Sequence, residues 1–161
     1  MNISIIVTCF NNSRTATHMS MLCLDHIRKF TDAPYQLIVM DPVPKFPIRD
    51  DYHTLCLDES HDTLWFKLDT DPGYTACMNI GFKHATGDVL VFMQNDVFVR
   101  ENWLKDLLWY IDNGHECVFP DQVPRDRQYV IDTYDRSFDD PQSKQGGRDA
   151  GLLMITKDAF A

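Results

Sequence analysis

An unbroken apolar run, Val89–Met93, ends directly on two amides and a carboxylate, Gln94-Asn95-Asp96. An apolar run of this length between polar turns is typical of a strand buried on both faces of a sheet. In open α/β sheets, ligands bind beyond the carboxyl ends of such strands. Asp96 therefore stands where a hard cation, Mg²⁺ or Mn²⁺, and a phosphate could meet. The alternative is that Asp96 only caps the following turn or helix.

The rest of the chain alternates between strand-like and helix-like segments. Further strands are predicted at Ile3–Val7, Tyr35–Met40, Thr63–Leu68, Cys117–Phe119 and Gly151–Ile155. Amphipathic helices are predicted at Arg14–Phe30, Tyr74–His84 and Asn102–Asn113, and Thr156 is predicted to cap a last helix. A strand–helix–strand order implies parallel strands with right-handed crossovers. The long segment Asp121–Asp149 lacks periodicity, which favours a functional or disordered loop.

Composition narrows the class of protein. The 161 residues fit one domain, and the net charge of −9 argues against a broad electrostatic grip on nucleic acid or anionic membrane. No apolar run approaches the length of a membrane span, and the amino terminus has the pattern of a strand, not of a signal peptide. Five cysteines without a C-x-x-C spacing argue against a disulfide framework and a zinc site. We therefore expect a cytoplasmic protein with reduced, mostly buried thiols.

Several motifs accompany this strand order. The first strand leads into Thr8-Cys9-Phe10-Asn11, and the second leads into Asp41. Residues 73–88 combine a glycine, Asn79-Ile80-Gly81 and Ala85-Thr86-Gly87-Asp88, and Asn102-Trp103-Leu104 follows the apolar run. Together these motifs resemble the family 2 inverting nucleotide-sugar glycosyltransferases. The resemblance implies an α/β fold of the GT-A type, a Rossmann-like three-layer sandwich with a mostly parallel central sheet, over residues 1–161.

The resemblance also implies an activity: transfer of a sugar from a nucleotide-diphospho-sugar to an acceptor, with inversion and with help from Mn²⁺ or Mg²⁺. It places the metal on Asp96. It implies nucleotide-binding roles for Thr8, Phe10, Asn11, Asp41, Asn79, Asp88, Gln94, Asn95 and Arg148. The acceptor stays open between a glycan, a lipid-linked molecule, a protein and a nucleic-acid base, and a homo-oligomer also stays open.

Each of these residues has a plainer interpretation. Asp41 could be a turn residue before Pro42, and Phe10 could belong to the core instead of stacking on a base. Asn79 could hydrogen-bond the donor loop and cap its own helix. Asp88 fits the orientation of loops better than contact with substrate, and Arg148 could be a solvated surface residue.

The chain departs from the family pattern in two places. The metal motif is commonly Asp-x-Asp, whereas Gln94 here replaces the first carboxylate. The family pattern places its general base after a strand like Gly151–Ile155, beyond the last residue of this chain. Asp121 and Asp149 are the candidate catalytic substitutes, with loop carboxylates as the alternative. We therefore expect the chain to bind the donor and to transfer sugar slowly or not at all.

Two other functions compete with this one. The first is a non-catalytic nucleotide-sugar-binding or protein-interaction module that retains the fold. The second is a nucleotidyltransferase on a related fold, which is less favoured because a Gly-rich basic loop is missing after the first strand.

Overall fold

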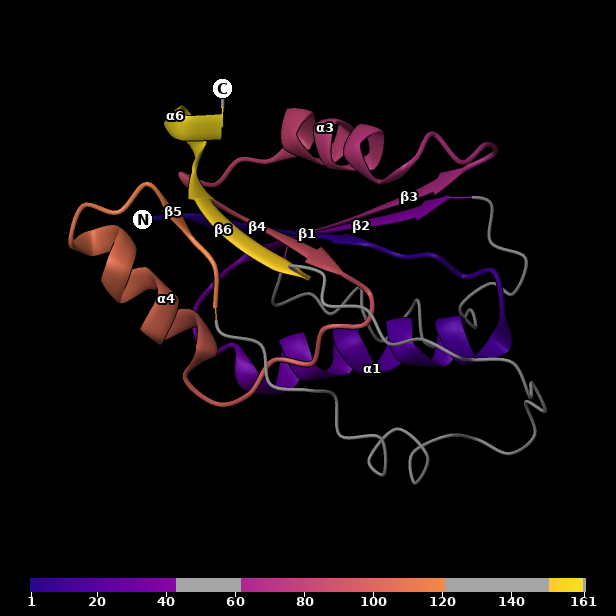
Figure 1. The fold of residues 1–161 in the computed structure, drawn as a ribbon, viewed down its shortest axis with the longest axis horizontal. Coiled ribbons are helices and arrows are strands. Elements are labelled where there is room, and N and C mark those ends of the chain that lie inside the picture. Colours follow the sequence, from indigo (N-terminus) through magenta and orange to yellow (C-terminus); the bar gives the residue numbers. More distant parts are fainter. Residues whose placement is uncertain (43–61, 121–150, 161) are drawn as a thin grey trace.

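The computed structural model describes residues 1–42, 62–120 and 151–160. Its strands are β1 (Ile3–Thr8), β2 (Gln36–Pro42), β3 (Asp62–Leu68), β4 (Val89–Gln94), β5 (Cys117–Val118) and β6 (Leu152–Thr156). Its helices are α1 (Arg14–Phe30), α3 (Tyr74–His84), α4 (Trp103–Asp112) and α6 (Lys157–Phe160). Figure 1 shows these strands as one twisted sheet between two layers of helices.

The sheet is mostly parallel. Its strand order is β3-β2-β1-β4-β6-β5, and the pairs β3·β2, β2·β1 and β1·β4 are parallel. The β6 strand runs antiparallel to β4 and to β5. The carboxyl ends of β1, β2, β3 and β4 therefore meet at one edge of the sheet. The strand–helix–strand expectation is confirmed.

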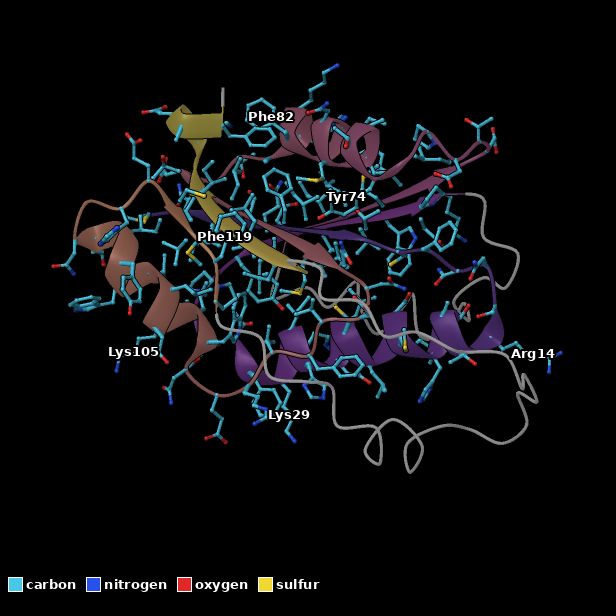
Figure 2. All side chains as sticks on the ribbon, in the orientation of Figure 1. Arg14, Lys29, Tyr74, Phe82, Lys105 and Phe119 are labelled. Atoms are coloured by element: carbon cyan, nitrogen blue, oxygen red, sulfur yellow. The ribbon has the colours of Figure 1, made fainter. Side chains whose placement is uncertain are left out.

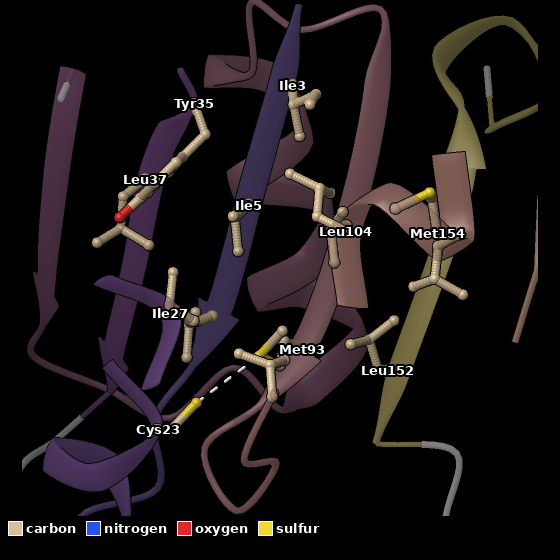
Figure 3. Close-up of a cluster of buried hydrophobic side chains, with 14 of the residues drawn as sticks. Ile3, Ile5, Cys23, Ile27, Tyr35, Leu37, Met93, Leu104, Leu152 and Met154 are labelled. Atoms are coloured by element: carbon tan, nitrogen blue, oxygen red, sulfur yellow. Dashed lines mark hydrogen bonds between the residues drawn. The ribbon is translucent and has the colours of Figure 1, made fainter. Parts of the chain in front are cut away.

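Successive side chains along the strands point to opposite faces of the sheet and form two separate cores. Ile5 and Val91 face the layer of α1 and α4, where Ile27 and Leu107 pack against them. Figure 3 shows part of this core, with Ile5, Ile27 and Leu37 in one cluster of side chains. The opposite face of the sheet carries Ile6, Ile38, Leu90 and Phe92, which pack with residues of α3. Both faces of the central strands are buried, which is why their sequences are continuous apolar runs.

Helix ends and close contacts follow from particular residues. Ser13 caps α1, because its Oγ accepts a hydrogen bond from the backbone N–H of Ala16 at 3.1 Å. The Thr156 hydroxyl accepts a hydrogen bond from the backbone N–H of Ala159 at 3.4 Å, so the predicted cap of α6 is confirmed.

Gly81 of α3 lies against Ile6, and an added Cβ would stand 2.5 Å from Ile6 Cγ2. A side chain there would force the Ile6 side chain to shift or the helix to move away from the sheet.

Two sequence predictions need correction here. Asp41-Pro42 does not end the second strand in a turn, because β2 runs through Pro42 and pairs with β3 as far as Leu68. The last residues of this strand are held by the neighbouring strand, which the local sequence does not reveal. The predicted strand Cys117–Phe119 is only the two-residue β5 at the edge of the sheet, where Cys117 is exposed and not buried.

This difference in burial predicts an order of thiol reactivity. Cys9, Cys23 and Cys77 are buried, and burial raises the pKa of Cys23 well above its usual range. Cys117 is exposed, so its thiolate is accessible to reagents. Under native conditions we expect a maleimide to label Cys117 before these three, as mapped by peptide mass spectrometry. Labelling of Cys23 at the rate of Cys117 in the folded protein would contradict the predicted packing.

None of the helices in the described ranges is long and apolar enough to cross a membrane.

Candidate functional site

The predicted nucleotide-binding residues converge where the parallel strands end. Thr8 is the last residue of β1, and it pairs with Met40 of β2 on one side and with Gln94 of β4 on the other. Asp41 is the residue after Met40. Neighbouring residues in such a register stand side by side. The strand pairing thus assembles Thr8, Asp41 and Gln94 at one edge from three separate parts of the sequence.

Asp41 is a buried carboxyl group within hydrogen-bond reach of the next loop. Its side chain is fully buried, and Oδ1 accepts a hydrogen bond of 2.7 Å from Asn11 Nδ2. Burial raises the pKa of Asp41, whereas the hydrogen bond from Asn11, the charge of Lys67 and the indole of Trp65 lower it. Its second oxygen, Oδ2, makes no hydrogen bond of good geometry among the described residues, although the Trp65 indole lies close enough to the carboxyl group to lower its pKa. A buried acceptor without a partner is suited to a ligand donor.

The end of β1 and the loop that follows it supply two further groups. Phe10 is 51% exposed, so the prediction that it could belong to the core is wrong. Its ring is free to stack on a planar ligand. Thr8 is buried, and its Oγ1 has no hydrogen-bond partner in the part of the chain that the structure describes. The edge therefore combines an apolar surface with unpaired polar atoms, as small-molecule sites do.

Asn11 belongs to a chain of polar side chains that sequence reasoning missed. Ser20 of α1 donates from Oγ to Asn11 Oδ1 at 2.7 Å, and Asn95 Nδ2 donates to Ser20 Oγ at 2.8 Å. Ser20 is fully buried. The signal that could have revealed it is a small polar residue on the sheet-facing side of an amphipathic helix.

The segment after β4 forms a tight turn that presents Asp96. The backbone N–H of Gln94 donates to Gly151 at 2.8 Å, and its carbonyl accepts from Val97 at 3.3 Å. Gln94, Asn95 and Asp96 are all half-buried. The negative charge of Asp96 adds to burial in raising the pKa of Cys23 below it. This turn holds the carboxylate at the same edge as Thr8.

The donor atoms at this turn suit a hard cation that a ligand helps to hold. Asp96 offers a carboxylate and Gln94 an amide oxygen, both of the oxygen type that Mg²⁺ and Mn²⁺ prefer. No group of three or more His, Cys, Asp or Glu side chains that could hold a metal occurs among the described residues. Mg²⁺ is commonly held by one or two carboxylates together with substrate phosphates. The residues present therefore fit a cation shared with a diphosphate.

Two predicted residues lie elsewhere. Asp88 precedes β4, so it stands at the opposite edge of the sheet, where its Oδ2 accepts a 2.9 Å hydrogen bond from the backbone N–H of Asn2. Asn79 is an exposed residue in the middle of α3, whose N-cap is Gly73, so its predicted capping role is wrong. The strand arrangement does not bring Asp88 to the edge that holds Asp41.

Three predicted residues, Asp121, Arg148 and Asp149, lie outside the described residues. Arg14, which sequence reasoning missed, is the first residue of α1. Figure 2 shows it at the end of the molecule where β2 and β3 terminate, with its side chain directed outward.

Comparisons with known proteins identify related sequences and folds. The sequence model of the family described as Glycosyl transferase family 2 matches residues 4–155. A search of the curated proteins finds no match.

Among solved structures, the chain is similar to the mannosyltransferase PcManGT from Pyrobaculum calidifontis in complex with GDP-Man and Mn²⁺. The identity is 16%, the TM-score is 0.69, and the match covers 98% of this chain and 45% of that one. It is also similar to S. aureus TarS 1-349, with 22% identity, a TM-score of 0.57 and coverage of 78% and 39%. The same TarS fragment in complex with UDP-GlcNAc matches with 21% identity, a TM-score of 0.56 and coverage of 78% and 37%.

The chain spans less than half the length of each of these proteins. At such identities the likeness shows the fold, and the GT-A class predicted from the sequence is confirmed.

Proposed function

Because the chain belongs to glycosyl transferase family 2, we propose that it binds a nucleotide-diphospho-sugar and transfers the sugar to an acceptor with inversion. The observation that carries this proposal is the meeting of Asp41, Thr8 and the turn at Asp96 at the carboxyl edge of the parallel strands. Ligands of open α/β sheets bind at that edge. The neighbours PcManGT, in complex with GDP-Man and Mn²⁺, and TarS, in complex with UDP-GlcNAc, support a donor of this class.

The nucleoside end of the donor belongs at Asp41 and Phe10. The unpartnered Oδ2 of Asp41 accepts a hydrogen bond from a base N–H or a ribose hydroxyl. Since Asn11 already holds Oδ1, the carboxyl group is fixed in orientation before the ligand arrives. The exposed ring of Phe10 supplies a stacking surface beside it. Preorganisation of this kind lowers the entropy that binding costs.

The diphosphate end belongs at the turn after β4. Asp96, assisted by Gln94, would hold Mn²⁺ or Mg²⁺ together with phosphate oxygens. When bound, such a cation neutralises the charge that develops on a diphosphate leaving group. The single carboxylate gives this chain a weak site for the free cation and a stronger one once a diphosphate contributes oxygens.

Transfer with inversion is one displacement at the anomeric carbon. The acceptor oxygen forms the new bond, the bond to the diphosphate breaks, and the nucleoside diphosphate leaves with the electron pair. A carboxylate takes the acceptor proton as general base, a role worth about 10²–10⁴-fold in rate. In this chain Asp121 and Asp149 are the proposed candidates. Substituting each by Asn separately, and measuring acceptor-dependent turnover, distinguishes them.

A non-catalytic module that retains the fold is the alternative function. It would bind the same donor and release no nucleoside diphosphate. The release of nucleoside diphosphate from a bound donor, with acceptor or water, therefore separates the two functions.

The cation assignment gives a direct test. We expect Mn²⁺ to tighten the binding of UDP or GDP by about fivefold or more, on the scale of a charge-assisted interaction. The Asp96→Ala protein should lose this dependence and retain its melting temperature. Isothermal titration in Mn²⁺ and in EDTA measures the affinities, and a thermal melt measures the melting temperature. The matched control is Asp106→Ala, because Asp106 is an acidic residue in the first turn of α4, away from the edge. Equal affinity in Mn²⁺ and EDTA for the unmodified protein would contradict the assignment.

A further inference from the structure

One buried chain of hydrogen bonds joins the two ends of the proposed donor site. It runs from Asn95 in the turn after β4, through Ser20 of α1 and Asn11 of the loop after β1, to Asp41 of β2. Its links measure 2.8 Å, 2.7 Å and 2.7 Å in that order. Three parts of the sequence that are far apart, namely residues 11–20, β2 and the turn after β4, are therefore connected through polar side chains.

The donors and acceptors in this series of hydrogen bonds have a definite order. Asn11 uses its NH₂ group on the Asp41 carboxyl, so its carbonyl oxygen is left to accept the proton of Ser20. The single proton of Ser20 lies within reach of two acceptors, Asn11 Oδ1 at 2.7 Å and the Ala16 carbonyl at 3.1 Å, and the shorter bond goes to Asn11. The Ser20 oxygen accepts from the NH₂ group of Asn95. A flipped Asn11 would set its carbonyl against a carboxylate oxygen and its NH₂ against Ser20. In these three hydrogen bonds each donor points toward Asp41, and dipoles aligned in this way reinforce one another. Like Ser20 Oγ, Asn95 Nδ2 also lies within reach of the Ala16 carbonyl, at 3.4 Å.

Packing alone does not explain these polar groups. Asp41, Ser20 and Asn11 are buried to within 1% of full burial, between the sheet and α1. Burying polar groups costs free energy that their mutual hydrogen bonds only partly return, and apolar side chains of similar volume serve a core as well or better. The one feature that both ends share is their place in the proposed site: Asp41 at the nucleoside and Asn95 beside Asp96.

We propose that Ser20 is a positioning residue, which holds Asp41 and the Asn95-Asp96 turn in one fixed geometry. This inference rests on the proposed function. Ser20 touches neither donor nor cation, and it acts through Asn11 and Asn95. The intact series of hydrogen bonds therefore keeps the nucleoside end and the cation end in their binding geometry together. A break in it weakens binding at both ends.

The experiment perturbs one end of the chain and measures at the other. Asn95→Ala removes the hydrogen-bond donor at the turn. Its effect is measured as the affinity for uridine and guanosine in EDTA, because these nucleosides carry no phosphate that could reach the turn. Ser20→Ala breaks the chain at its centre, and it is read as the ratio of UDP or GDP affinity in Mn²⁺ to that in EDTA. The control is Thr17→Val, because Thr17 carries a buried hydroxyl on the same helix that donates a 3.1 Å hydrogen bond to the Ser13 carbonyl, which is not part of this series of hydrogen bonds.

We expect Asn95→Ala to weaken nucleoside binding by roughly 2- to 10-fold, the range of one hydrogen bond. Ser20→Ala should reduce the Mn²⁺ ratio by a similar factor, and the Thr17→Val protein should keep both quantities. The Asn95→Ala, Ser20→Ala double variant should be no worse than either single variant, because one break interrupts the whole chain. A purely structural role would lower the melting temperature and leave the Mn²⁺ ratio unchanged.

Two outcomes are distinct. If the unmodified protein binds neither UDP nor GDP, the proposed function fails and the inference falls with it. If the unmodified protein binds, and the variants keep the nucleoside affinity and the Mn²⁺ ratio, the inference alone is overturned. Should Ser20→Ala not fold, the nucleoside affinity of the half-buried Asn95→Ala variant decides.

Discussion

The Asp41→Asn protein is expected to bind UDP or GDP about tenfold or more weakly than the unmodified protein and to remain folded. A hydrogen bond to a charged group contributes about 1.5–3 kcal/mol, and the neutral amide removes that charge. The shape of the side chain is kept, and the amide oxygen still accepts from Asn11. Isothermal titration measures the affinity, and a thermal melt measures the fold.

The same substitution should change how stability depends on pH. Burial raises the pKa of Asp41, so the folded protein binds this proton more tightly than the unfolded chain does. The contribution is fully present below the unfolded pKa of about 4 and is lost as the pH rises through the folded pKa. Relative to the unmodified protein, Asp41→Asn should therefore gain stability as the pH rises from about 4 toward neutral. Urea unfolding at several pH values measures this difference.

Asn12→Ala is the control for Asp41→Asn, because Asn12 is an exposed neighbour of Asn11 in the same loop. It should leave affinity and pH dependence unchanged. A normal melt together with normal nucleotide affinity in the Asp41→Asn protein would mean that Asp41 has only a structural role.

The Gly87→Ala protein should lose about 3 kcal/mol of stability, at the upper end of the range for overpacked sites. An added Cβ would stand 2.5 Å from the backbone nitrogen of Ser4 and 2.8 Å from the carbonyl carbon of Ile3. These atoms belong to a central strand and cannot rotate away. The Gly87 N–H also donates to Ser4 Oγ at 2.9 Å, and a displaced backbone would lose that bond.

Urea unfolding of three variants tests this packing argument. Thr86→Ala, at the exposed neighbouring position, should stay within about 0.5 kcal/mol of the unmodified protein. Gly81→Ala should fall between the two, because its close contact is the side chain of Ile6, which has some freedom to move. A Gly87→Ala protein as stable as Thr86→Ala would contradict the close approach of these backbones.

Local sequence predicted most of the fold. The predicted strands and helices agree with the structure at residues 3–7, 14–30, 74–84 and 89–93. A continuous apolar run or a helical period can be recognised from consecutive residues alone. What the sequence did not contain is how the strands end. Pairing with β3 extends β2 through Pro42, and the edge position of β5 leaves Cys117 exposed. Both depend on a neighbouring strand, not on the segment itself.

The site was predictable to the extent that strand ends mark it. Thr8, Asp41 and Gln94 each come directly after an apolar run in the sequence. Because the strands formed by these runs are parallel neighbours, the sheet brings the three residues together. Asp88 ends the Ala85-Thr86-Gly87-Asp88 motif, and it lies at the opposite edge because it precedes its strand instead of following it. Ser20 could not be placed, since its partners Asn11 and Asn95 come from loops whose meeting depends on tertiary packing.

The central claim is that this chain binds a nucleotide-diphospho-sugar at the carboxyl edge of its sheet. Native mass spectrometry against a panel of such donors, including UDP-GlcNAc and GDP-mannose, tests it without knowledge of the acceptor. We expect a one-to-one complex with at least one donor, with an occupancy that rises when Mn²⁺ is added and falls in the Asp41→Asn protein. The absence of binding by every donor in the panel, in the presence of Mn²⁺ or Mg²⁺, would contradict a donor site at this edge.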